Sequence, residues 1–251
     1  MKQLLVIVLP LVLLWMLASC SFTNDYPPAN TVPHTENKYQ YSEPPQVTSA
    51  VSPTESLPTD PLVTDATVIA EPKASDFVRV LDYIPDLIID LKYAGTENFT
   101  GVAIYDSGEA WLRYGTVNKL IQVQTELKEM GYGLMLWDGF RPPAAQWKLW
   151  EICPDPTYVS DPNKGFSNHS RGNTVDITLV DGTGRELEMP TGFDDFSKMA
   201  NRDYSDCTVT AASNAQLLEK IMEKHGFKGY YGEWWHYTDC DSYDVEHEFI
   251  P

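Results

Sequence analysis

A proline-rich, acidic stretch at residues 21–75 most constrains what this chain can fold into. It holds nine prolines, many Ser, Thr and Asn residues, and seven acidic residues against two lysines, with no sustained apolar periodicity. Such a segment cannot bury enough apolar surface to offset the entropy of ordering it, and its charge keeps it extended. We therefore expect a disordered tether here and one folded domain at residues 76–251.

The chain as a whole is strongly acidic. Lys and Arg residues total 18 against 36 Asp and Glu residues, which gives a formal net charge of −18. This charge repels a polyanion, and the sequence holds no run rich in Lys or Arg that would overcome the repulsion. We therefore expect no nucleic-acid partner.

The N-terminal region carries the most apolar stretch of the sequence. Residues 4–18 are almost all apolar and follow the cation Lys2. A run of about 15 residues is short for a membrane-spanning helix, which needs roughly 20, and is typical of a secretory signal. The sequence therefore predicts a signal peptide rather than a membrane span.

Residues 17–20, Leu-Ala-Ser-Cys, resemble the lipobox of bacterial lipoproteins, in which the cysteine is acylated after cleavage. The resemblance implies a signal peptide at residues 1–20 and a lipid anchor on Cys20 as the only membrane contact. It also implies an extracytoplasmic location. An ordinary signal peptide with an incidental cysteine is the alternative.

From residue 76 onward, segments typical of strands alternate with segments typical of helices. Short apolar or β-branched runs predict strands at residues 87–91, 134–137 and 174–180. Helical spacing and helix-start signals predict helices around 117–127 with a stop at Gly131, from the prolines at 142–143 to 152, and from a capping box at Ser213 and Gln216 to a stop at Gly226. Because no regular βαβ repeat occurs, we expect an α+β fold with a central antiparallel sheet and flanking helices.

Three cysteines lie in the predicted domain, Cys153, Cys207 and Cys240. An oxidising compartment allows one disulfide among them, and their spacing does not select the pair. No C-x-x-C spacing occurs, so we expect no zinc site built from these thiols.

Two short motifs gather the residue types that bind a catalytic zinc ion. SNHSRGNTVD, at residues 167–176, places His169 seven residues before Asp176, and EWWHY, at residues 233–237, contains Glu233 and His236. Two imidazoles and one carboxylate form a common zinc set that leaves a fourth position for water, and Glu233 is then placed to take a proton from that water. Residues three apart on a flat strand face opposite ways, so we expect a bulge or turn in the second motif.

A third motif, DGFRPP at residues 138–143, sets Arg141 on a turn directly after a predicted apolar strand. A guanidinium at this position can donate hydrogen bonds to an oxyanion in fork geometry. Taken alone, a surface arginine on a turn is the alternative interpretation.

Together these motifs resemble those of the zinc-dependent D-alanyl-D-alanine dipeptidases of the vancomycin-resistance type. The resemblance rests on SNHSRGNTVDITL, GEWWHY and WDGFRP, and on IDLKYAGTENFTG, which is similar to the opening strand and loop of that family. It implies the fold shared with zinc D,D-carboxypeptidases and the Hedgehog signalling domain, and one zinc ion per domain. The roles it implies are zinc ligand for His169, Asp176 and His236, catalytic base and acid for Glu233, and transition-state stabiliser for Arg141.

The same resemblance implies which residues bind the substrate. Tyr93 and Asp194, which follows Phe193, match positions near the substrate ammonium, and Ser167 lies beside the position that holds the substrate carboxylate. Asp195 is the alternative to Asp194 because the two are adjacent. A free dipeptide is a zwitterion, so its pocket must pair an ammonium and a carboxylate at a fixed separation.

These features predict hydrolysis of the free dipeptide D-Ala-D-Ala. An enzyme outside the membrane does not reach the cytoplasmic pool of this dipeptide, so we expect a role in the turnover of cell-wall fragments rather than in glycopeptide resistance. A D,D-carboxypeptidase that trims D-Ala from peptidoglycan stem peptides is the first alternative, although the HSRG and EWWHY sequences favour the dipeptidases. A non-catalytic, zinc-containing binding lipoprotein is the second, and the presence of both Glu233 and Arg141 argues against it.

Overall fold

The computed structural model describes residues 70–251. The predicted signal peptide, the predicted lipidation site Cys20 and nearly all of the predicted tether lie outside these residues. Regular structure begins with the short strand β1 (Phe77–Arg79). No helix within residues 70–251 combines the length and the apolar character that a membrane span requires.

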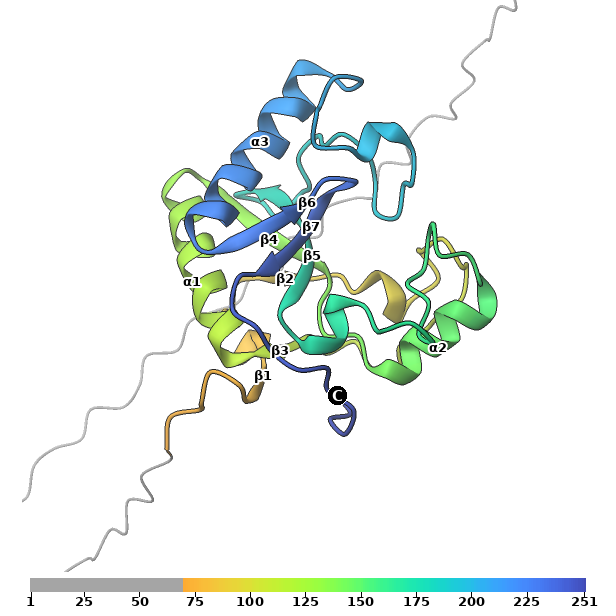
Figure 1. The fold of residues 1–251 in the computed structure, drawn as a ribbon. Helices are drawn as coiled ribbons and strands as arrows, with labels where there is room; N and C mark the ends of the chain where they lie inside the picture. Colours follow the sequence, from red (N-terminus) through yellow and green to blue (C-terminus); the bar gives the residue numbers. More distant parts are fainter. Residues whose placement is uncertain (1–69) are drawn as a thin grey trace, which may run out of the picture. The chain divides into compact units, whose positions relative to one another are not determined.

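The centre of the domain is a five-stranded sheet in the order β2-β4-β5-β7-β6 (Figure 1). Its strands are β2 (Ile88–Ile89), β4 (Tyr132–Asp138), β5 (Thr174–Asp181), β6 (Phe227–Tyr230) and β7 (Glu233–Asp239). All neighbours pair antiparallel except β2 and β4, which are parallel. β1 forms a separate antiparallel pair with β3 (Trp111–Arg113). The predicted central antiparallel sheet is confirmed, with one short parallel strand at its edge.

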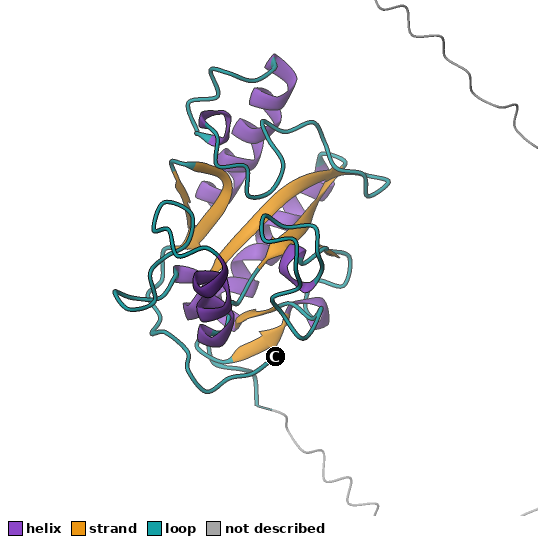
Figure 2. Cartoon of the chain, turned by 90° about the vertical axis from the view of Figure 1, so that its right-hand side faces the viewer, coloured by secondary structure: helices purple, strands orange, loops and turns teal. Residues whose placement is uncertain are grey.

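Within residues 70–251, three α-helices accompany the sheet: α1 (Tyr114–Glu129), α2 (Pro143–Ile152) and α3 (Val209–Lys224). α1 contacts β4 and α3, and α3 also contacts β5, β6 and β7. α2 packs in a smaller apolar cluster that includes Tyr93 and Ile104. α2 lies on the right-hand side of Figure 1, which faces the viewer in Figure 2, and loops surround it there. The predicted α+β class is therefore confirmed.

The apolar residues whose spacing predicts α1 lie on the face of the helix that is buried. Val117, Leu120, Val123 and Leu127 are all fully buried in the main core, as expected for the apolar stripe of an amphipathic helix. The helix ends just before Gly131, whose φ of 83° is a left-handed conformation that glycine adopts without strain. The predicted stop at Gly131 is confirmed.

The predicted start of α3 is wrong. The helix begins at Val209, and the Thr208 hydroxyl caps it by accepting a hydrogen bond from the Ala211 N–H at 3.1 Å. Ser213 lies inside the helix and donates its hydroxyl to the carbonyl of Val209 at 2.8 Å. A Ser followed by Gln three residues later fits the capping-box pattern even within a helix. Because Thr208 is followed at that spacing by an alanine, the pattern selected the wrong residue.

The disulfide that an oxidising compartment allows among the three cysteines is not formed within residues 70–251. The three cysteines are free thiols. Cys153 follows α2, Cys207 precedes α3, and Cys240 follows β7. The fold is therefore held by its core rather than by a covalent crosslink.

Candidate metal centre and active site

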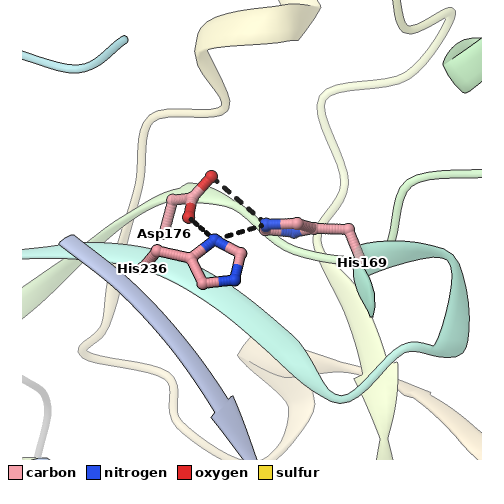
Figure 3. Close-up of side chains that lie close together, drawn as sticks. All are labelled: His169, Asp176 and His236. Atoms are coloured by element: carbon pink, nitrogen blue, oxygen red, sulfur yellow. Dashed lines mark hydrogen bonds and ion pairs between the residues drawn. The ribbon is translucent and has the colours of Figure 1, made fainter. Parts of the chain in front are cut away.

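Two neighbouring strands and one short turn bring the predicted metal ligands together. Asp176 of β5 lies opposite His236 of β7 in the sheet register, and His169 comes from the 3₁₀ turn η3 (Asn168–Arg171), which precedes β5. Figure 3 shows the three side chains pointing toward one another. Nε2 of His169 lies 3.3 Å from both Nδ1 of His236 and Oδ2 of Asp176, and Nδ1 of His236 lies 3.0 Å from Oδ1 of Asp176.

These separations fit a zinc ion. Imidazole and carboxylate ligands at about 2.0–2.2 Å in a tetrahedron lie roughly 3.3–3.6 Å from one another, so the two 3.3 Å separations match this spacing and the 3.0 Å one is slightly shorter. Because a carbonyl oxygen only accepts, Nδ1–H of His169 must donate to the Gly139 carbonyl at 2.8 Å, which leaves the Nε2 lone pair for a metal. Burial alone would raise the pKa of Asp176, but the two imidazoles hold it well below its ordinary value. The donor set therefore matches zinc in both spacing and charge.

Glu233 shares β7 with His236, and the bulge expected between them is present. The β6–β7 register passes from Gly229 opposite Tyr237 directly to Tyr230 opposite Glu233, so β7 carries extra residues between these pairs. Oε2 of Glu233 consequently lies 3.4 Å from Nδ1 of His236. Burial raises the pKa of the Glu233 carboxyl, which suits a group that accepts and returns a proton.

Arg141 follows β4, and buried polar partners fix its guanidinium. It donates to Oδ2 of Asp138 from Nη2 at 2.6 Å and from Nε at 3.2 Å, and its Nη1 donates to Oε1 of Gln146 at 3.4 Å. Cζ lies 5.0 Å from the centre of the Tyr93 ring, within cation–π range. Asp138 is fully buried and also accepts a hydrogen bond from the hydroxyl of Tyr105. These contacts leave the arginine little rotational freedom.

The turn that carries His169 is tied to the turn that carries Arg141. Ser167 caps η3, because its hydroxyl accepts a hydrogen bond from the His169 N–H at 3.3 Å. The Arg141 N–H donates to the carbonyl of His169 at 3.2 Å, and the Ser170 hydroxyl donates to the carbonyl of Arg141 at 2.8 Å. A metal ligand and the candidate oxyanion donor therefore belong to one hydrogen-bonded unit.

Asp194 lies in the long connection between β5 and α3. Its Oδ2 accepts a hydrogen bond from the Tyr93 hydroxyl at 2.8 Å, and its φ of 54° is uncommon for a residue other than glycine. Burial raises its pKa to about 7. Asp195 instead accepts a hydrogen bond from the Ser197 N–H at 2.8 Å. The structure places Asp194, rather than Asp195, beside Tyr93.

These groups line one open cavity of about 390 Å³. The predicted site residues in its wall are Tyr93, Arg141, Ser167, His169, Asp176, Asp194, Glu233 and His236. The fold therefore brings together every site residue predicted from the sequence within residues 70–251. The cavity therefore combines three candidate metal ligands, a carboxyl whose pKa is raised by burial, a fixed guanidinium and a second buried acid.

A family model described as D-ala-D-ala dipeptidase, of the M15 peptidases, matches residues 73–250. The chain belongs to this family. The D-alanyl-D-alanine dipeptidase of Escherichia coli (strain K12) is 39% identical over 166 residues, which cover 65% of this chain and 86% of that protein. Its counterpart in Enterococcus faecalis (strain ATCC 700802 / V583) is 36% identical over 173 residues, which cover 61% and 85%. A solved structure of VanYB in complex with D-Alanine-D-Alanine aligns with a TM-score of 0.37 and 16% identity, over 55% of this chain and 76% of that chain.

This M15 dipeptidase family is zinc-dependent, which agrees with the spacing of the three candidate ligands. Three residues outside the predicted set support Arg141: Asp138 and Gln146 accept its hydrogen bonds, and Tyr105 donates to Asp138. An aspartate three residues before an arginine in the DGFRPP turn is a signal for an ion pair, and it was available in the sequence. Tyr105 lies 33 residues from the aspartate that it contacts, and no local pattern connects the two.

Proposed function

We propose that this M15 dipeptidase hydrolyses the free dipeptide D-Ala-D-Ala. The observation that carries the proposal is that one cavity holds the candidate zinc ligands, the buried Glu233 carboxyl, and a second buried acid, Asp194, bonded to Tyr93. The candidate zinc ligands and Glu233 suit hydrolysis of a peptide bond, and Asp194 suits a substrate with a free ammonium. The relatives named D-alanyl-D-alanine dipeptidase support the choice of dipeptide.

The residues of the chain divide the chemistry between them. Zinc, when held by the two histidines and Asp176, supplies a Lewis acid that polarises the scissile carbonyl and lowers the pKa of water. Glu233, with its raised pKa, takes a proton from the attacking water and gives it to the leaving amine. Arg141 uses Nε and one N–H of Nη2 to hold Asp138, and one N–H of Nη1 to bind Gln146. The remaining N–H on each Nη donates to the oxygen that gains negative charge.

The ends of the substrate meet two further groups. The Asp194 carboxylate, oriented by the Tyr93 hydroxyl, pairs with the substrate ammonium. The Ser167 hydroxyl, at the start of η3, donates to the substrate carboxylate. A peptide that lacks the free ammonium next to the scissile bond leaves Asp194 buried without its partner, which is unfavourable. The site therefore prefers a free dipeptide to the end of a longer stem peptide.

Hydrolysis of three substrates by the purified protein tests this proposal. We expect release of D-Ala from D-Ala-D-Ala, and a kcat/KM lower by at least about tenfold, the effect of roughly 1.4 kcal/mol, for N-acetyl-D-Ala-D-Ala and for a wall pentapeptide. Faster cleavage of the pentapeptide would identify a D,D-carboxypeptidase instead. Binding of zinc with no turnover of any of the three would identify a non-catalytic binding protein.

We further propose that the domain acts outside the cytoplasmic membrane, held by a lipid on Cys20, in the turnover of cell-wall fragments. The apolar run at residues 4–18 and the following Leu-Ala-Ser-Cys sequence support this location. We expect a Cys20→Ser variant to leave the membrane fraction, or to stay uncleaved, with unchanged activity of the domain. Recovery of the wild-type protein from the cytoplasm with Met1 intact would contradict the location and would favour the resistance-type role.

A further inference from the structure

Arg202 donates hydrogen bonds to the hairpin that carries both Glu233 and His236. It follows the 3₁₀ turn η4 (Lys198–Ala200), and its side chain is only 6% exposed. Nε donates to the carbonyl of Tyr230 at 2.8 Å, and Nη2 donates to the carbonyls of Trp234 and His236, both at 2.9 Å. One guanidinium therefore binds the two carbonyls of β7 that flank the bulge residue 235, together with the end of β6.

The register of the hairpin shows why these carbonyls need a donor. Between the Gly229–Tyr237 pair and the Tyr230–Glu233 pair, residues 234–236 of β7 have no residue opposite them on β6. A regular antiparallel partner would supply N–H groups to the carbonyls on this side of β7, and a buried carbonyl without a donor is unfavourable. The Arg202 guanidinium occupies the place of the missing strand.

The surroundings are shaped for a planar guanidinium. A Cβ added at Gly229 would overlap Cζ and Nε of Arg202, so the absence of a side chain on β6 leaves room for the arginine. Cζ lies 4.3 Å from the centre of the Tyr237 ring, whose hydroxyl accepts from Nη1 at 3.1 Å. Oε1 of Glu219, on α3, lies 3.4 Å from Nη1. A lysine ammonium does not reproduce this flat set of donors.

We propose that Arg202 is a positioning residue: it replaces the strand donors missing at the bulge and so holds Glu233 and His236 on the same face of β7. This inference rests on the roles proposed above for those two residues. Without the guanidinium, the regular ladder can re-form across the bulge, which turns one of the two side chains away from the cavity. The consequences fall on zinc affinity and on the proton carrier, while the groups that bind the ends of the dipeptide stay in place.

The test compares Arg202→Met with Arg185→Met in the full-length chain. Arg185 is the matched control, because its side chain is 80% exposed and pairs with Asp181 rather than with the hairpin. We expect Arg202→Met to weaken zinc binding, measured by chelator competition without substrate, by about 10–100-fold, as for other residues that orient metal ligands. We also expect a fall in kcat that exceeds the change in KM, partial recovery in Arg202→Lys, and no change in Arg185→Met.

A zinc dissociation constant within about twofold of wild type in Arg202→Met would overturn the proposal. So would lower thermal stability with unchanged zinc affinity, because that result assigns Arg202 to the fold alone. If Arg202→Met does not fold, Gly229→Ala displaces the guanidinium without removing it, and unchanged zinc affinity there overturns the proposal equally. Since zinc binding is measured without substrate, a wild-type chain that fails to cleave D-Ala-D-Ala would refute the proposed function and leave this test intact.

Discussion

The metal half of the site and its substrate half are built in different ways. Asp176 and His236 are cross-strand partners on two central strands of the sheet, and β5 is buried along nearly its whole length. Asp194 lies on a long connection, in a left-handed backbone conformation, and is held by the Tyr93 hydroxyl. Sheet register therefore fixes two of the three candidate metal ligands, whereas individual side-chain contacts fix the group proposed to bind the substrate ammonium.

The two halves therefore respond differently to structural change. A one-residue slip of β7 would turn all of its side chains to the other face, so the metal half is either formed or lost. The position of Asp194 depends on its neighbour Phe193, whose ring packs 5.5 Å from Tyr93 and 5.7 Å from Trp137 between ring centres. Such side-chain contacts can change by small amounts without loss of the fold. We therefore expect substitutions around Asp194 to adjust substrate preference.

The largest effect on catalysis is expected at Glu233, the proposed proton acceptor, which lies on the same strand as the candidate ligand His236. Glu233→Ala should lower kcat by on the order of 10²–10⁴-fold, because the water loses its proton acceptor. The variant should still bind about one zinc ion per chain, as measured by elemental analysis. Loss of the zinc would show that Glu233 is a ligand and that the division of β7 into ligand and base is wrong.

Arg141 joins the two halves, and its removal should have the next largest effect. Arg141→Ala should lower kcat by roughly 10²–10³-fold, with a smaller change in KM, because the guanidinium serves the transition state more than the ground state. Steady-state kinetics on D-Ala-D-Ala measure both constants, with Arg185→Ala as the exposed-arginine control. A rise in KM alone would make Arg141 an anchor for the substrate carboxylate instead.

The smallest of these effects concerns the substrate half and depends on pH. Burial raises the pKa of Asp194, and the hydrogen bond from Tyr93 partly opposes this effect. The resulting pKa is about 7. Because ionised Asp194 is the form proposed to bind the ammonium, kcat/KM should increase as the pH rises through about 7. Tyr93→Phe removes the bond that favours the carboxylate, so this transition should move to higher pH and kcat/KM at pH 7 should fall a few-fold.

The pH profile of kcat/KM is the measurement that checks this last prediction. Tyr231→Phe is a suitable control, since the Tyr231 hydroxyl bonds to Asp203 and its side chain is exposed. An unchanged profile in Tyr93→Phe would show that the Tyr93 hydroxyl does not govern the ionisation of Asp194. The substrate half would then need a different organising contact.

How far the sequence predicts each half follows from the same contrast. His169, Asp176 and His236 stand in short motifs whose local pattern is enough to indicate their chemistry, and the need for a bulge after Glu233 follows from strand geometry alone. The choice between Asp194 and Asp195 could not be made, because a loop has no periodicity that tells which of two adjacent side chains turns inward.

The supporting residues were the least predictable part. Arg202 lies 28 residues before Tyr230, whose carbonyl accepts one of its hydrogen bonds. The sequence around Arg202 shows no motif. Tyr105, likewise, reaches Asp138 only through the tertiary fold. Contacts that depend on how distant segments pack leave no signal in a single sequence, whereas residues that share a short motif, such as His169 with Asp176 or Glu233 with His236, do.

The zinc content of three purified proteins tests the division between the two halves most directly. We predict about one zinc ion per chain for the wild type, almost none for His236→Ala, and about one for Asp194→Asn, because only the first substitution removes a ligand of the sheet-built half. Full zinc retention in His236→Ala, or loss of zinc in Asp194→Asn, would contradict this prediction.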